Sequence, residues 1–192
     1  LLGNIPYVSV FQDIREEKVP LLEILNKEFT NKIDDAETKQ IKFERFFYQE
    51  ALRNLFTSIR FLNTGSKNKI YTITSSLPSE GKSLINILLA KTIADSGNKV
   101  LLIDADLRKP KIHSRLSINN LKGFSNLLTD MKLNLNDVLQ PVPGYSNWSV
   151  VPAGIIPPDP TRLLGSDRAK FIFKDLQNSE QFDYVLIDTP PI

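Results

Sequence analysis

Three successive residues, Gly81, Lys82 and Ser83, have the types and spacing that phosphate chemistry requires. They follow the apolar stretch IYTI and precede LINILLA, whose apolar positions have helical spacing. A loop between a strand and a helix surrounds a phosphate with backbone N–H groups, and the helix N-terminus adds partial positive charge. The lysine would contact the β- and γ-phosphates of a nucleotide, and the serine hydroxyl would coordinate Mg²⁺. SSLPSEGKS therefore predicts a phosphate-binding loop, although Ser76 stands where the strict pattern has glycine.

Alternating charged residues follow a second apolar run. Asp104, Asp106 and Arg108 come after residues 100–103 at every second position. Because alternate residues of an extended chain point the same way, two carboxylates and a guanidinium would face one spot. Two close carboxylates repel unless a cation lies between them, and a Mg²⁺-bound nucleotide would supply that cation. The alternative is a helix N-terminal cap followed by a solvent-exposed turn.

A third apolar run, residues 184–187, leads to a single carboxylate, Asp188. An aspartate at such a strand end holds Mg²⁺ in P-loop nucleotidases, directly or through water. Each motif alone could arise by chance, as a Gly-Lys-Ser at a helix start or an aspartate at a strand end. Together they supply a lysine for phosphates, oxygen ligands for Mg²⁺ and a carboxylate pair for activating a nucleophile. The single histidine, His113, follows a basic stretch and is interpreted as structural or solvent-facing.

Strands and helices are expected to alternate along the chain. The expected strands are residues 69–74, 100–103, 148–151 and 184–187. The expected helices are residues 34–62, 83–96, 124–129, 135–139 and 160–176. This alternation predicts an α/β fold with a mostly parallel sheet flanked by helices. Ligands bind at the carboxyl ends of the strands in such sheets, which is where all three motifs lie.

The first of these helices has one apolar stripe, made by Phe47, Ala51, Leu55, Ile59 and Leu62. On the same helix, Glu50 and Arg53 lie three residues apart and share a face. This pair is either a structural ion pair or a contact to another subunit.

Composition excludes several classes of function. The formal net charge is only +2, which is too small to argue for nucleic acid or an anionic membrane as a partner. The absence of cysteine excludes disulfides and thiolate metal sites. No apolar run reaches the roughly 18 residues that a membrane-spanning helix needs.

The three motifs, in this order, resemble those of the bacterial tyrosine kinases of capsular and exopolysaccharide synthesis, the BY-kinases. SSLPSEGKS resembles their Walker A motif, LLIDADLRKP their second aspartate-rich motif (Walker A′) and VLIDTPP their Walker B motif. PAGIIPPDPTRLLGS resembles the segment before their last helix, and EALR followed by IRF resembles their leading helix. LLGNIPY resembles the juxtamembrane stretch of members whose membrane and kinase parts share one chain. The resemblance covers nearly the whole chain.

The resemblance implies an ATP-dependent, Mg²⁺-dependent protein-tyrosine autokinase with a P-loop three-layer fold preceded by a long N-terminal helix. It divides the chain into a juxtamembrane-like connector (1–34), a leading helix and loop (35–66) and a P-loop kinase domain, incomplete at its C-terminus (67–192). The implied nucleotide-binding residues are Ser79, Glu80, Gly81, Lys82, Ser83, Leu84 and Arg108. The implied metal-binding residues are Ser83, Asp104 and Asp188, and the implied catalytic residues are Lys82, Asp104 and Asp106. Which aspartate acts as the base stays open.

The same resemblance implies where such a chain acts and with what. The partners would be other copies of itself, in a ring that phosphorylates in trans, and a membrane polysaccharide co-polymerase region or subunit, with no nucleic acid. The location would be the cytoplasmic face of the bacterial inner membrane.

Two features depart from the family pattern. Phe56 stands at the third position of the E-x-x-R-x-x-R pattern that helps to form the ring. None of the tyrosines clusters at a terminus, where family members carry their acceptor tail; they are Tyr7, Tyr48, Tyr71, Tyr145 and Tyr184. The alternative function is a P-loop ATPase of the partitioning or division-site type. Such ATPases carry a signature lysine in the loop where this chain has Leu77.

Overall fold

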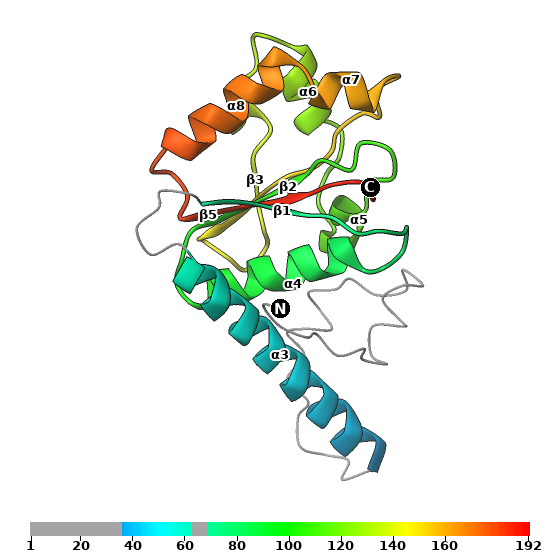
Figure 1. Cartoon of the computed structure of the whole chain (residues 1–192), viewed down its shortest axis with the longest axis vertical. Helices are drawn as coiled ribbons and strands as arrows, with labels where there is room; N and C mark the ends of the chain where they lie inside the picture. Colours follow the sequence, from blue (N-terminus) through cyan, green and yellow to red (C-terminus); the bar gives the residue numbers. More distant parts are fainter. Residues whose placement is uncertain (1–35, 63–68) are drawn as a thin grey trace.

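The computed structural model describes residues 36–62 and 69–192. A five-stranded sheet forms the middle layer, and helices cover both of its faces (Figure 1). The predictions for residues 1–34, including Tyr7, lie outside the described residues. The predicted three-layer α/β fold is confirmed for the remainder, whereas the division of the chain into three parts stays a prediction.

The sheet is parallel except at one edge. Its strands are β1 (Ile70–Ile73), β2 (Val100–Asp104), β3 (Gln140–Pro141), β4 (Trp148–Val151) and β5 (Tyr184–Asp188). Their order is β1-β5-β2-β4-β3, and only β3 runs antiparallel, against β4. In the register of β2 and β5, Asp104 lies opposite Asp188. The ends of two neighbouring, buried strands therefore bring two carboxylates together.

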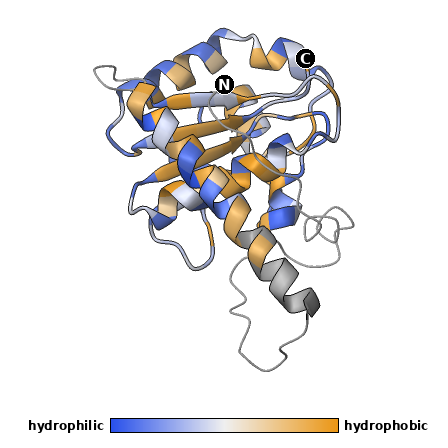
Figure 2. Ribbon diagram, turned by 60° about the horizontal axis from the view of Figure 1, so that its bottom comes forward, coloured by the Kyte–Doolittle hydropathy of each residue, from blue (hydrophilic) through white to orange (hydrophobic). Residues whose placement is uncertain are grey.

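Helices fill the layers on either side of the sheet (Figure 1). One layer holds α3 (Ala36–Leu62), α4 (Lys82–Asp95) and α5 (Ile112–Leu116), and the other holds α6 (Phe124–Thr129), α7 (Pro160–Leu164) and α8 (Asp167–Asn178). Strand β2 contributes side chains to the core on both faces of the sheet. Leu102 packs in the core on the α4 side and Leu101 in the core on the α8 side, as expected for a strand buried on both faces. Apolar residues accordingly dominate the central strands (Figure 2).

The apolar stripe predicted for α3 is only partly right: Ile59 is buried and Leu55 packs half-buried against the core, but Leu62 is exposed. Tyr48, Leu52 and Phe56 are buried against the core, together with Ile59, whereas Phe47 is exposed. Both sets of residues have helical spacing, so periodicity alone does not decide which one faces the core. Although α3 is 27 residues long, neither it nor any other helix in the described ranges is apolar enough to cross a membrane.

Three further expectations need correction. The helix expected at 160–176 is two helices, because the chain turns at Gly165 and the Ser166 hydroxyl caps α8 by accepting the Ala169 N–H (3.2 Å). The helix expected at 135–139 is a single 3₁₀ turn, η1 (Leu135–Asp137). The short elements α5 and β3 were not predicted. The other strands and helices agree with expectation to within one or two residues.

The packing of α3 can be tested with two phenylalanines. Phe56 is 4% exposed, and its ring meets that of Tyr184 edge-on at a centroid distance of 5.2 Å, whereas Phe47 is 46% exposed. We expect Phe56→Ala to lower the free energy of unfolding by about 3–5 kcal/mol, because it leaves a cavity in the core. Phe47→Ala, the matched control, should change it by less than about 1 kcal/mol. Urea denaturation measures both, and equal losses would contradict this packing.

Candidate nucleotide-binding and catalytic site

The loop between β1 and α4 has the backbone shape of a phosphate-binding loop. Gly81 (φ 92°) and Ser79 (φ 67°) are left-handed, whereas Ser76 is not among the described residues with positive φ. The position that lacks the glycine of the strict pattern therefore does not require one. The Glu80 carboxylate accepts a hydrogen bond from the Leu77 N–H (3.0 Å) and so fixes the loop from within.

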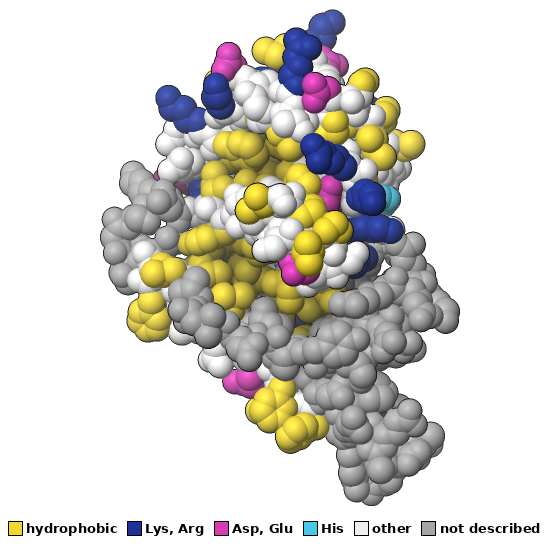
Figure 3. All heavy atoms as spheres, turned by 45° about the vertical axis from the view of Figure 1, so that its right-hand side comes forward, with side chains coloured by type: hydrophobic (Ala, Val, Ile, Leu, Met, Phe, Trp, Pro, Cys, Tyr) yellow, Lys and Arg dark blue, Asp and Glu magenta, His cyan; other side chains and the backbone are white. Residues whose placement is uncertain are grey.

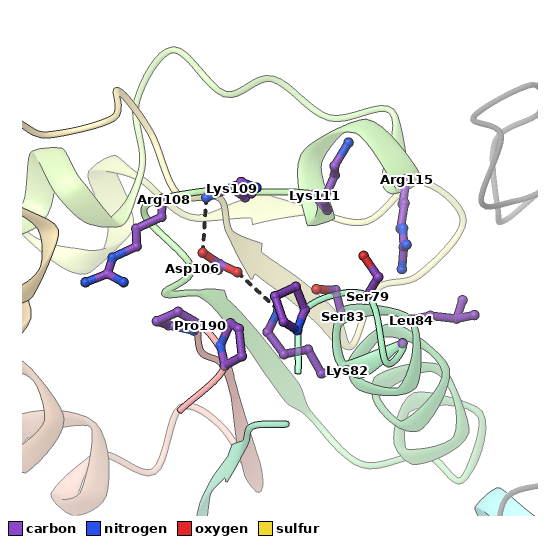
Figure 4. Close-up of a pocket in the computed structure, with 13 residues that line it drawn as sticks. Ser79, Lys82, Ser83, Leu84, Asp106, Arg108, Lys109, Lys111, Arg115 and Pro190 are labelled. Carbon is purple, nitrogen blue, oxygen red and sulfur yellow. Dashed lines mark hydrogen bonds and ion pairs between the residues drawn. The ribbon is translucent and has the colours of Figure 1, made fainter. Parts of the chain in front are cut away.

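Lys82, the first residue of α4, forms a nearly buried ion pair with Asp106. Its Nζ lies 3.1 Å from the Asp106 Oδ2, and the two side chains are 11% and 6% exposed. The other carboxylate oxygen of Asp106 accepts the Lys109 N–H (3.1 Å; Figure 4). The ion pair holds the lysine at the start of α4, where the helix dipole also attracts anions. A phosphate oxygen could replace the carboxylate as its partner.

Asp104 and Asp188 lie behind this ion pair, fully buried. Burial, and then the charge of Asp188, raise the pKa of Asp104 to about 8, against the hydrogen bonds that it accepts from the Ile112 and Asp106 N–H groups (3.2 Å each). Burial also raises the pKa of Asp188, against the effects of the Ser83 hydroxyl, the Lys82 charge and a side-chain amide. Both carboxyls are thus held in surroundings that disfavour their charged forms.

That amide belongs to Asn86, which sequence reasoning missed. Asn86 is fully buried and donates from Nδ2 to the Asp188 Oδ1 (2.9 Å). It follows Ser83 by three residues on α4, so both side chains share the helix face that meets β5. The available signal was a single polar residue within the apolar stretch LINILLA.

The carboxylates and the serine hydroxyl fit a divalent cation. The Asp188 Oδ2 is buried and accepts no hydrogen bond, and a nearby cation would relieve the repulsion between Asp188 and Asp104. Carboxylate and hydroxyl oxygens are the donors that Mg²⁺ prefers. In residues 36–62 and 69–192, no group of three or more His, Cys, Asp or Glu could hold a metal ion. Ser83, Asp188 and Asp104 therefore suit an ion whose remaining ligands are phosphate oxygens and water.

A cavity of about 520 Å³ opens over the loop. Its lining includes five cationic side chains and one carboxylate, namely Lys82, Arg108, Lys109, Lys111, Arg115 and Asp106. Figure 4 shows that these side chains come from the start of α4, from the segment between β2 and α5, and, for Arg115, from α5 itself. On the molecular surface, Lys and Arg side chains gather beside the single histidine (Figure 3). Such an excess of positive charge suits a polyanionic ligand.

The structure brings most of the predicted residues together, but not all. The cavity is lined by Ser79, Gly81, Lys82, Ser83, Leu84, Asp106 and Arg108. Glu80, Asp104 and Asp188 do not line it. The prediction that Asp104, Asp106 and Arg108 face one spot is only partly right: Asp106 and Arg108 line the same cavity, where the Arg108 guanidinium donates to the Thr161 hydroxyl (2.9 Å), but Asp104 is buried beneath it. Sequence reasoning also missed Lys109, Lys111 and Arg115 as cavity residues, although the run RKPK signalled a basic cluster.

Known proteins share this architecture. Residues 68–192 match the family described as an AAA domain. The chain is 38% identical over 143 residues to the tyrosine-protein kinase etk of Escherichia coli K12, covering 74% of this chain and 19% of that protein. It is 35% identical over 162 residues to the tyrosine-protein kinase YwqD of Bacillus subtilis, covering 84% of this chain and 64% of that protein. The chain thus spans less than two thirds of either relative.

Solved structures agree. The kinase domain of the E. coli tyrosine kinase ETK matches the whole chain and 69% of its own length, with a TM-score of 0.77 and 31% identity. The chimerical protein CapA2B2 matches the whole chain and 71% of its own length, with a TM-score of 0.72 and 27% identity. The MinC:MinD complex of Aquifex aeolicus, 21% identical with a TM-score of 0.53, shares the fold alone.

The fold and the loop define a P-loop nucleotide-binding domain of the AAA type. Within that class, the chain belongs to the family of bacterial tyrosine kinases. The resemblance inferred from its motifs is confirmed.

The role of Asn86 can be separated from that of the fold. In Asn86→Ala, Asp188 loses a buried donor, so we expect the free energy of unfolding to fall by about 1–3 kcal/mol. Asn86 orients Asp188, a proposed Mg²⁺ ligand, so its loss should weaken only the binding that depends on Mg²⁺. We expect the variant to bind ADP about 10–100-fold more weakly in the presence of Mg²⁺, with little change in EDTA. Calorimetric titration measures both affinities. Asn178→Ala, at the exposed end of α8, is the control, and an equal loss in EDTA would contradict this role.

The buried carboxyl of Asp104 predicts a pH dependence of stability. In metal-free buffer the folded chain keeps this proton up to about pH 8, whereas the unfolded chain releases it near its ordinary pKa of 3.8. Between these values the folded state binds more protons, so the Asp104 contribution to the free energy of unfolding falls as pH rises. Asp104→Asn should lack this decline, and Asp175→Asn, on the exposed face of α8, should keep it. Urea denaturation in EDTA across this range measures the slopes, and parallel curves for wild type and Asp104→Asn would refute the assignment.

Proposed function

We propose that this chain is the nucleotide-binding and catalytic part of an ATP-dependent protein-tyrosine autokinase that regulates capsular or exopolysaccharide synthesis and export. The observation that carries the proposal is the place of Asp106. Its carboxylate lines a strongly basic cavity and lies 3.1 Å from the ammonium group of Lys82, the lysine of the phosphate-binding loop. A base and a phosphate-binding cation thus share one cavity wall.

The proposed chemistry is transfer of the γ-phosphoryl group of ATP to a tyrosine hydroxyl: a P–O bond to the tyrosine oxygen forms, the bond from the γ-phosphorus to the β,γ-bridging oxygen breaks, and ADP leaves. Lys82, the loop N–H groups and the start of α4 hold the phosphates, and bound Mg²⁺ neutralises their charge. Asp106 accepts the proton of the attacking hydroxyl, because it is the carboxylate that reaches the cavity. Asp104, which is buried and accepts two backbone hydrogen bonds, serves the metal site with Ser83 and Asp188. Little covalent chemistry is asked of the protein, so positioning supplies most of the rate.

The proposal includes cofactors, partners and location. ATP and Mg²⁺ are the cofactors that the cavity and the buried carboxylates suit. Other copies of the chain, in a ring that phosphorylates in trans, and a membrane polysaccharide co-polymerase are the partners known for the family that its motifs resemble. The cytoplasmic face of the inner membrane is the corresponding location.

The second candidate is an ATPase of the partitioning type, which hydrolyses ATP without modifying tyrosine. The sheet and the loop are compatible with both activities. Leu77 favours the kinase, because it stands where the ATPases carry their signature lysine.

One substitution tests the assignment. Lys82→Met removes the cation for the phosphates, so phosphotyrosine formed with ATP and Mg²⁺ should fall by more than about 100-fold. Phosphotyrosine and free phosphate are measured together, on the chain and on added tyrosine-containing peptides. Lys174→Met, on the exposed face of α8, is the matched control and should keep the activity. Free phosphate without phosphotyrosine in the wild type would favour the ATPase, and undiminished phosphotyrosine in Lys82→Met would refute the site.

A further inference from the structure

We propose that the basic wall of the cavity, defined as Arg108, Lys109, Lys111 and Arg115, selects an acceptor segment whose tyrosine is flanked by acidic residues. This inference rests on the proposed function, since it names the substrate class of the same site.

The position of Asp106 decides where an acceptor can approach. One of its carboxylate oxygens faces Lys82 on α4, and the other accepts the backbone N–H of Lys109. A base must come within about 3 Å of the hydroxyl from which it takes the proton. The loop and α4 occupy one side of Asp106 and are committed to the phosphates. The acceptor therefore reaches Asp106 along the other side, over residues 108–115 (Figure 4).

On that side, every charged residue that lines the cavity in residues 36–62 and 69–192 is cationic. The basic wall contributes four cations to the lining, and Asp106 is the only acidic residue that lines the cavity within the described ranges. Arg108, Lys109 and Lys111 are exposed, and Arg115 is half-buried. Bound Mg²⁺ and Lys82 already offset much of the charge of a triphosphate, so the basic wall exceeds what the nucleotide requires.

An acceptor passing over this wall would meet cations at close range on either side of its tyrosine. Opposite charges across such a contact strengthen binding and exclude wrong partners, and like charges oppose it. Acidic residues within a few positions of the tyrosine lie inside the screening length, which is about 8–10 Å at physiological salt. A segment with lysine or arginine at these positions is disfavoured.

Peptide binding tests this without relying on turnover. Three fluorescent peptides carry one central tyrosine flanked by Asp and Glu, by Asn and Gln, or by Lys, and the chain is saturated with ADP and Mg²⁺. We expect the acidic peptide to bind about 10-fold more tightly than the neutral one, by anisotropy, and the advantage to shrink between about 50 mM and 300 mM salt. Lys109→Glu and Lys111→Glu should each weaken it by about 3–10-fold, Lys109→Arg should retain it, and Lys174→Glu should change it by less than about 2-fold.

Each contrary result overturns the inference. Equal affinities for the three peptides, no measurable binding, or an equal loss of acidic-peptide affinity in Lys174→Glu would show that the basic wall does not select acidic acceptor segments. An acidic peptide with alanine in place of tyrosine that binds as tightly would show that the wall attracts acidic segments but not acceptors. If acidic peptides bind as expected while the wild type forms no phosphotyrosine, the kinase proposal fails and the recognition remains.

Discussion

Two carboxylates held side by side in the core are the constraint on which the rest of the site depends. Asp104 and Asp188 end neighbouring buried strands in matching register, so neither can turn to solvent. Burying such groups is unfavourable unless donors or a cation surround them. The donors come from two directions, because the N–H groups of Asp106 and Ile112 point at Asp104 and the Asn86 amide points at Asp188. The loop after β2 and helix α4 are thereby fixed to the sheet edge.

The same hydrogen bonds keep the buried carboxylates apart from the charged pair, Lys82 and Asp106, that lines the cavity. In the proposed function, the buried carboxylates and Ser83 would bind a cation together with phosphate oxygens. The groups at the cavity surface, Lys82 and Asp106, are paired with each other, and in the proposed function a phosphate oxygen would replace Asp106 as the partner of Lys82. The Ile112 N–H also donates to Asp104, which fixes the segment after β2 against the sheet edge. The cations of residues 108–115 therefore line the side of the cavity away from α4.

Local sequence signals predicted the loop and every strand except β3, whereas the facing of α3, the break at Gly165 and the partner of Asn86 depend on contacts beyond the local pattern. β2 and β5 were predictable because a continuous apolar run that ends in aspartate suits a strand buried on both faces. The facing of α3 was not, because two stripes share its period and only contact with α4 separates them. The break at Gly165 depends on a cap by Ser166 within a continuous helical pattern. The partnership of Asn86 with Asp188 joins residues 102 positions apart, which no local pattern records.

Phe56, which departs from the family pattern, has a packing role in this chain. The pattern that this chain resembles has arginine there, but position 56 is 4% exposed and faces the ring of Tyr184. A guanidinium at this place would lose its hydration, whereas a phenyl ring adds apolar contact. The cation Arg60 instead lies over the ring of Phe56, 5.8 Å from its centroid. Of the pattern, Glu50 and Arg53 remain toward solvent, paired with each other at 2.6 Å, so in this chain the third position anchors α3 to the sheet and leaves the surface charge to the other two.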